Sequence, residues 1–237
     1  MKLKPFFTYF GGKYRATPYY ARPQHRTIIE PFAGSAGYSL NYSGLDVHLY
    51  DVDPIIYGVW DYLIRAKPSE ILLLPEVIVD VRVLALPQEA KWLIGFWLNK
   101  GMVSPCNIPG KWMREDIKLG RTLDSYWGPG LKSRIASQVG HIKHWKISNT
   151  PYYEIENRDA CWFIDPPYKR SGSHYRFHDI DYVRLGGFCK SRIGQVQVCE
   201  QLGADWLPFE PFRAIKSLEG RNGSKQSVEL LYSKDRV

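Results

Sequence analysis

The first third of the chain alternates short apolar runs with stretches of helical spacing. Residues 27–32 form an apolar run rich in β-branched side chains, and in residues 47–51 apolar and polar positions alternate, as is typical of strands. Residues 33–37 form a glycine-rich turn, and residues 38–42 have the spacing of an amphipathic helix. Residues 53–66 predict a second helix, which begins on an Asp-Pro pair. The order is therefore strand, turn, helix, strand, helix.

The middle of the chain has helical patterns on both sides of an irregular stretch. Residues 88–98 predict a helix, and residues 131–145 again show helical spacing. Between residues 101 and 130, repeated glycines and prolines predict no long regular element.

Three later runs predict further strands. Residues 161–165 are a continuous apolar run that two prolines interrupt, which is typical of a buried strand. Residues 194–199 and 227–232 are the other two candidates, and further prolines break the chain between them. Together with the opening elements, these strands predict a doubly wound α/β domain, which binds a nucleoside-containing ligand at the carboxyl ends of its strands.

Charge is concentrated in one part of the sequence. The whole chain of 237 residues carries a net charge of +8. Residues 91–150 hold ten Lys and Arg against three acids, a net charge of +7, and five of the eight tryptophans. A basic, tryptophan-rich segment suits a polyanionic partner, so we interpret it as a binding module set into a nearly neutral scaffold.

Several classes of protein do not fit the composition. With 44% hydrophobic and 24% charged residues, the chain is neither a disordered protein nor a coiled coil. The four cysteines show no CxxC pairing, so neither a disulfide framework nor a zinc site is expected. No apolar run approaches the ~20 residues needed to span a bilayer, and the N-terminus lacks the pattern of a signal peptide. We expect a cytoplasmic protein without a membrane partner.

Two clusters are candidates for chemistry. In the glycine turn, small residues let the backbone approach a ligand, and Asp51 at the end of the next strand is placed to accept hydrogen bonds from two ribose hydroxyls. After the buried strand, Asp165, Pro166, Pro167 and Tyr168 form the second cluster. Its prolines remove two N–H donors and leave a rigid row of acceptors for an amino group, while the tyrosine offers a flat face for stacking. Each cluster alone also fits an ordinary turn or strand end.

Four motifs together resemble the Dam-type N6-adenine DNA methyltransferases, in the same order along the chain. They are F-x-x-x-G-G-K at residues 7–13, E-P-F-A-G-S at 30–35, Y-D-V-D at 50–53 and F-I-D-P-P-Y at 163–168. The resemblance covers about the first 65 residues and residues 149–185 well, the C-terminal part loosely and the basic middle hardly at all. Four ordered motifs are far more specific than any one of them.

The resemblance implies S-adenosylmethionine as the cofactor and a Rossmann-like methyltransferase sheet. The cofactor-binding residues that it implies are Tyr9, Phe10, Gly11, Gly12, Lys13, Glu30, Pro31, Phe32, Ala33, Gly34, Ser35, Asp51 and Asp165. The first five would pack over the cofactor, the turn would contact its methionine part, and Asp51 would hold its ribose. In one departure, the family often has a second glycine where Ala36 stands, and this chain has Gly37 one place later.

The implied activity is methylation of adenine N6 in double-stranded DNA after the base has been flipped out of the helix. Asp165, Pro166, Pro167 and Tyr168 would be the catalytic residues. The segment between the cofactor turn and this motif is the target-recognition domain in the family's alpha group. Candidate DNA-contacting residues are Lys111, Trp112, Arg114, Lys118 and Arg121 in irregular chain, with Lys169 and Arg170 in a later loop.

We therefore expect residues 1–68 and 147–237 to form the methyltransferase domain, and residues 69–146 to form the inserted basic target-recognition segment. The resemblance also implies the cytoplasm of a bacterium or of a phage-infected host. Methylation of cytosine N4, or of adenine in RNA, is an alternative with the same chemistry. A catalytically inactive nucleic-acid-binding protein on the same scaffold is an alternative from another class.

Overall fold

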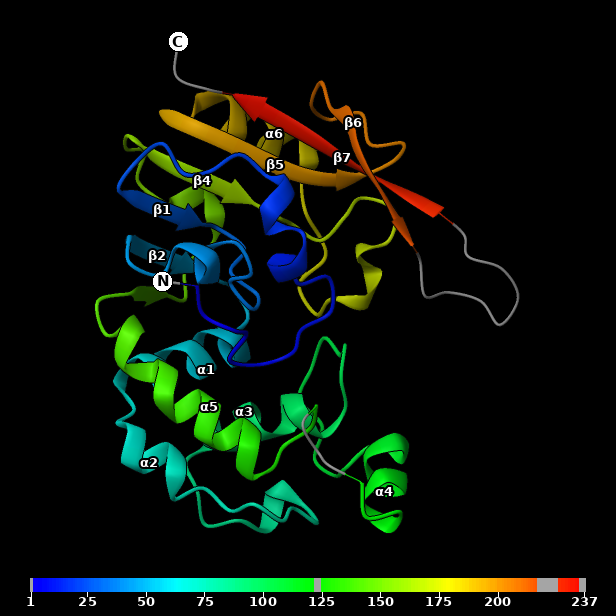
Figure 1. Cartoon of the computed structure of the whole chain (residues 1–237). Helices are drawn as coiled ribbons and strands as arrows, with labels where there is room; N and C mark the ends of the chain where they lie inside the picture. The colour runs from blue at the N-terminus through cyan, green and yellow to red at the C-terminus, as the bar shows by residue number, and fades with distance from the viewer. Residues whose placement is uncertain (1, 122–124, 217–225, 235–237) are drawn as a thin grey trace.

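The computed structural model describes residues 2–121, 125–216 and 226–234. At its centre is a seven-stranded sheet with the strand order β3-β2-β1-β4-β5-β7-β6 (Figure 1). The strands span Thr27–Glu30 (β1), Asp46–Tyr50 (β2), Lys146–Ser148 (β3), Ala160–Ile164 (β4), Gly194–Gln201 (β5), Glu210–Lys216 (β6) and Gln226–Lys234 (β7). Neighbouring strands from β3 to β5 are parallel, whereas β7 is antiparallel to β5 and to β6. The mixed α/β class expected from the sequence is confirmed.

The chain order of the strands reverses between β1 and β4. From β1 the sheet is built outward through β2 and β3, and the chain then returns to place β4 on the other side of β1. In open parallel sheets, loops diverge at such a point and leave a crevice beyond the carboxyl ends of the strands. In this fold, that point lies at the carboxyl ends of β1 and β4.

Six α-helices lie in the described part of the chain. They span Pro54–Arg65 (α1), Pro68–Leu72 (α2), Gln88–Leu98 (α3), Lys111–Lys118 (α4), Pro129–Val139 (α5) and Tyr182–Ser191 (α6). The side chain of Asp53 accepts a hydrogen bond from the Ile55 N–H at the start of α1, which is a standard N-cap. The predicted bounds of α3 are confirmed at both ends, and α1 matches its predicted span to within one residue at its carboxyl end.

Side chains pack on both faces of the sheet. One face presents Ile28, Val47 and Phe163 to a large cluster that also contains Trp60 of α1 and Phe96 of α3. The other face carries a smaller cluster, in which residues of β4 and β5 pack against α6. Burial on both faces explains why β4 is a continuous apolar run rather than an alternating one.

Residues 69–146 contribute mainly helices to this fold. Figure 1 shows α2, α3, α4 and α5 gathered at one end of the molecule, below the sheet. Side chains of α3 and α5 belong to the same buried cluster as the sheet residues, and the indole N–H of Trp97 donates to the Phe6 carbonyl over 2.8 Å. The segment is therefore joined to the sheet by a shared core.

Three local expectations are wrong. Residues 38–42 form only a short 3-10 helix, Ser39–Tyr42, because β2 begins soon after it, at Asp46, and leaves no room for a longer helix. The helix predicted for residues 131–145 ends at Val139. Residues 111–118, expected in irregular chain, form α4, whose inner face is held by the buried Met113.

Within the described residues, no helix combines the length and the apolar character that a membrane crossing requires.

Candidate active site

A cavity lies beyond the carboxyl ends of β1, β2 and β4. Twelve of the thirteen predicted cofactor-binding residues line it, and Pro31 does not. They are Tyr9, Phe10, Gly11, Gly12, Lys13, Glu30, Phe32, Ala33, Gly34, Ser35, Asp51 and Asp165. The fold thus brings together residues that lie up to 156 positions apart in the sequence, at the place where the strand order reverses.

The N-terminal segment packs tightly on the glycine turn. A Cβ atom on Gly37 would lie 2.5 Å from the Tyr14 backbone nitrogen and 2.8 Å from that of Lys13. A Cβ atom on Gly12 would lie 2.9 Å from Oγ of Ser35. No side chain fits between these two segments, so the glycines set the distance between the two walls of the cavity.

The turn itself contains two residues in the left-handed region. Gly34 has a φ of 44° and Ala36 a φ of 49°, and Ala36 is the one non-glycine residue with positive φ among the described residues. An L side chain in that region costs about 1–2 kcal/mol. Residue 36 is therefore an alanine with the left-handed backbone that is typical of glycine. The methyltransferases that the sequence resembles often have glycine at this position.

Asp51 holds the turn from the end of β2. Its carboxylate accepts hydrogen bonds from the N–H of Gly34, over 3.0 Å, and from the N–H of Asp53, over 2.9 Å. Burial raises its pKa to about 7, against the effect of the two hydrogen bonds. Each carboxylate oxygen keeps a free lone pair, so the group can still accept from a ligand hydroxyl.

Glu30 supports the opposite end of the turn. Its Oε1 accepts a hydrogen bond from the Ser39 N–H over 2.8 Å, and burial raises its pKa to about 8. A neutral Glu30 at pH 7 suits a group that holds the backbone and does not carry charge into the cavity.

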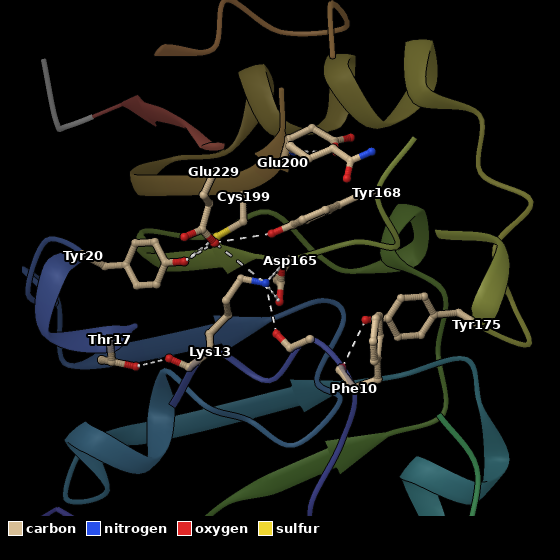
Figure 2. A network of polar contacts seen from close by, with 12 residues as sticks. Phe10, Lys13, Thr17, Tyr20, Asp165, Tyr168, Tyr175, Cys199, Glu200 and Glu229 are labelled. Atoms are coloured by element: carbon tan, nitrogen blue, oxygen red, sulfur yellow. Dashed lines mark hydrogen bonds and ion pairs between the residues drawn. The ribbon is translucent and has the colours of Figure 1, made fainter. Parts of the chain in front are cut away.

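Asp165 follows β4 and meets Lys13 across the floor of the site (Figure 2). The Lys13 ammonium donates to Oδ2 over 2.8 Å and lies 2.7 Å from Oδ1. Burial raises the pKa of Asp165, and the neighbouring ammonium opposes that rise. Burial would by itself lower the pKa of Lys13, but Asp165, acting together with other acidic groups nearby, outweighs it and the pKa is raised overall. The two groups therefore form an ion pair.

Tyr168 is turned further inward than the sequence suggested. Its hydroxyl donates to Glu229 of β7 over 3.4 Å, and the Lys13 ammonium lies 4.9 Å from the centre of its ring. Tyr168 packs partly buried against the larger core cluster. Neither Tyr168 nor Pro166 lines the cavity, whereas Pro167 does.

The loop after Tyr168 covers part of the cavity. The Tyr175 hydroxyl donates to the Phe10 carbonyl over 3.1 Å, and Arg176 and Phe177 line the cavity. Lys169, one of the candidate DNA contacts, forms an ion pair with Asp205 over 2.7 Å. The guanidinium of Arg170, another candidate, lies beside Gly203.

Sequence reasoning missed several of these groups. Tyr175 and Phe177 were not expected in the cavity, although they stand in an aromatic stretch just after the Asp-Pro-Pro-Tyr motif. Glu229 was not expected in the site either. The available signal was an acid within the apolar run of β7, at a strand position that faces the core.

The candidate DNA contacts on the basic segment lie on the surface. Lys111, Trp112, Arg114 and Lys118 come from α4, and Arg121 follows it. All five are exposed, and Trp112 presents 68% of its surface to solvent. The Phe10 N–H donates to the Met102 carbonyl over 3.2 Å, so the segment leading to α4 touches the rim of the cavity.

Other basic side chains of residues 91–150 are held internally. Lys132 is buried and forms an ion pair with Glu76 over 2.7 Å. Arg134 donates to the Pro5 carbonyl over 2.9 Å, and Lys143 donates to carbonyls at the end of α1. Part of the positive charge counted in the sequence thus stabilises the fold and does not face a partner.

No family model matches the chain, and no curated protein matches it significantly. A solved structure described as a conserved hypothetical protein from Streptococcus pyogenes is similar at 10% sequence identity, with a TM-score of 0.36. The match covers 92% of this chain and 89% of that one. At these values the similarity carries no argument about function.

Proposed function

We propose that this chain is a DNA adenine N6-methyltransferase that uses S-adenosylmethionine. The main support is that four motifs, separate in the sequence, line one cavity at the point of strand reversal. That point is where open α/β sheets bind nucleoside-containing ligands. The fold alone would fit many functions, so the proposal depends on the groups in the cavity.

The residues in the cavity fit the cofactor by their chemistry. The glycine turn lines the cavity with Gly34 and Gly37, and Asp51 supplies an acceptor for ribose hydroxyls. Tyr9, Phe10 and Phe177 supply flat apolar walls for the adenine ring. When bound, S-adenosylmethionine supplies a methyl group that its positive sulfur has already activated.

Asp165 supplies the acceptor that the target amine needs. Its Oδ1 atom is buried and accepts no hydrogen bond from the described residues, although it is in ion contact with Lys13. An amino group placed there donates to this oxygen, and the carboxylate stabilises the positive charge that develops on the nitrogen. Adenine N6 is a weak nucleophile because its lone pair is delocalised into the ring, so alignment and charge stabilisation must provide most of the rate.

The base must leave the duplex to reach this floor, at a cost of about a few kcal/mol. The exposed basic face of α4 and the loop over the cavity are the surfaces that would hold the DNA while the base is out. Phosphate contacts of that kind position the duplex without reading its sequence.

The test is incubation of the full chain with S-adenosylmethionine labelled on its methyl group and a mixture of double-stranded DNAs, followed by nucleoside analysis. We expect label in N6-methyl-2′-deoxyadenosine, and Asp165→Asn serves as the matched negative control. Label in N4-methylcytosine, or in RNA added to a parallel reaction, would replace adenine in DNA as the substrate. DNA binding without any transfer would support an inactive nucleic-acid-binding protein.

A further inference from the structure

A buried charge cluster includes the Asp165 carboxylate, and it joins the N-terminal segment to β7 (Figure 2). The Lys13 ammonium lies 2.7 Å from Asp165 and 3.9 Å from Glu229. Glu229 accepts a hydrogen bond from the Tyr20 hydroxyl over 2.6 Å and lies 3.6 Å from the Arg213 guanidinium. Two acidic residues, Asp165 and Glu229, thus lie close to two basic residues, Lys13 and Arg213, and their opposite charges balance inside the fold.

The position of the Lys13 ammonium differs from the one that the family resemblance implies. Its side chain is 11% exposed, and the ammonium contacts both Asp165 oxygens and donates to the Gly11 carbonyl over 3.1 Å. The ammonium therefore donates two hydrogen bonds to protein oxygens, one to Oδ2 of Asp165 and one to the Gly11 carbonyl. Lys13 lines the cavity, and its ammonium is in contact with the Asp165 carboxylate.

Asp165 needs such a partner because of where it lies. Burial favours the neutral acid, and a protonated carboxyl has one acceptor fewer for an incoming amine. Glu229 adds to this effect, because a second negative charge nearby also raises the pKa of Asp165. Lys13 acts in the opposite direction.

We propose that Lys13 is a positioning residue, which keeps the Asp165 carboxylate ionised and oriented toward the target amine, and that Glu229 sets the strength of this pairing from β7. The inference rests on the proposed function for the identity of the amine. The pairing itself depends only on the positions of the three side chains. Lys13 is thereby assigned a role in holding the substrate, through Asp165, whereas Asp51 keeps its proposed role in cofactor binding.

Several other groups also act on Asp165, from every element packed around it. Tyr168 lies in the same loop, and Tyr175 lies further along it. The remaining groups are Glu30 of β1, Cys199 and Glu200 of β5, and Tyr20, which reaches the cluster through Glu229. Among the described residues, Lys13 is the one cation in direct contact with Asp165.

The pairing is tested by two substitutions that remove charges of opposite sign. Lys13→Met removes the ammonium, and Glu229→Gln removes the second carboxylate with little change of shape. The readout is the Asp165 side-chain carboxyl signal in carbon NMR of the full chain, assigned with Asp165→Asn and followed through a pH titration. We expect Lys13→Met to move the Asp165 midpoint upward by at least about one pH unit, and Glu229→Gln to move it downward.

Lys13→Arg should restore most of the parent midpoint, because it returns a cation to the same place. Lys146→Met, which removes an exposed lysine from β3, is the matched control and should leave the midpoint unchanged. Calorimetry should show that Lys13→Met binds S-adenosylmethionine within about threefold of the parent, a difference of about 0.6 kcal/mol. Circular dichroism checks that each variant is folded. If Lys13→Met does not fold, the direction of the midpoint shift in Glu229→Gln tests the inference by itself.

Shifts of the same sign in both variants, or no shift in either, would overturn the inference. A large loss of cofactor affinity in Lys13→Met, with an unchanged midpoint, would return Lys13 to the cofactor site. The titration needs no turnover, so it is independent of the proposed function. A parent protein that transfers no methyl group, yet shows the opposite shifts, would remove the proposed reaction and keep the pairing.

Discussion

Two groups of basic residues in this protein have opposite surroundings. Lys13 has a side chain that is 11% exposed and lies 2.7 Å from Asp165, whereas Lys111 on α4 has a side chain that is 74% exposed and lies 3.9 Å from Glu115. A charge in the first setting acts strongly on one neighbour, because little water screens it. A charge in the second setting acts weakly on any one neighbour, but it contributes to the field around the surface. The net charge counted from a sequence does not distinguish buried charges from exposed ones.

The comparison predicts that the largest effect comes from the cavity floor. Asp165→Asn keeps the shape but replaces one acceptor oxygen by an NH₂ group and removes the negative charge. We expect methyl transfer to slow by at least about 10²-fold to 10³-fold, as when a preorganised donor or acceptor facing developing charge is removed. Single-turnover methylation at saturating cofactor measures this step without product release.

DNA affinity should change little in the same variant, because phosphate contacts provide most of it. Asp165→Ala should be as slow or slower, since it offers the amine no acceptor. Transfer by Asp165→Asn at nearly the parent rate would exclude a role of the carboxylate on the amine and, with it, the proposed adenine site.

The next effect concerns the cofactor wall. Asp51→Ala should weaken S-adenosylmethionine binding by about 1.5–3 kcal/mol, the range for hydrogen bonds to a charged group. Only the ionised carboxylate offers both oxygens as acceptors, so parent affinity should rise as the pH rises through about 7. Calorimetry at several pH values measures both effects. Asp61→Ala, on the nearby helix α1, is the control and should bind normally.

A smaller effect is expected when a side chain is added where the N-terminal segment packs on the glycine turn. Gly37→Ala places a methyl group 2.5 Å from the Tyr14 nitrogen, so the N-terminal segment must move. We expect a loss of about 1–3 kcal/mol in the free energy of unfolding, measured with denaturant, as for other overpacked sites. Gly44→Ala meets nothing within 4 Å and should change stability by much less. Equal stability of the two variants would show that the walls are not in firm contact.

The smallest effect per residue belongs to the exposed surface. Reversing the charges of Lys111, Arg114, Lys118 and Arg121 to Glu should weaken DNA binding and flatten its dependence on salt. The slope of log affinity against log salt should fall by about 0.9 for each phosphate that is no longer bound. Cofactor affinity should stay the same. A salt slope equal to that of the parent, or an equal weakening on reversing the exposed Lys67 and Lys190, would show that α4 is not the DNA surface.

The sequence predicted the elements whose local patterns are strong. Helix α3 was found to the residue because apolar positions recur at helical spacing and Pro87 precedes its first residue. Strand β3 has three residues and α4 buries a single methionine, so neither leaves enough of a pattern to be found locally. Strand β6 contains Pro211, which normally argues against a strand, and it is tolerated because β6 lies at the sheet edge beside a register shift.

The candidate site was predictable where a motif carries its own geometry. The glycine turn and Asp51 are 17 residues apart and join two adjacent strands, so their meeting follows from the strand order. Lys13 and Asp165 are 152 residues apart in the sequence, and no local pattern predicts that they pair. Glu229 was out of reach for the same reason, because it enters the site only when β7 pairs with β5.

The place of β7 in the sheet also has a consequence for biosynthesis. β7 follows β6 in the chain but lies between β5 and β6, so β6 has no strand to pair with until β7 has been made. A nascent chain that ends before β7 already contains the glycine turn, Lys13 and Asp165, but it lacks Glu229 and exposes the edge of β5. Such an intermediate has an open sheet edge, which is the usual template for aggregation. We therefore expect late-arriving β7 to complete the charge cluster and to close the vulnerable edge in one folding event.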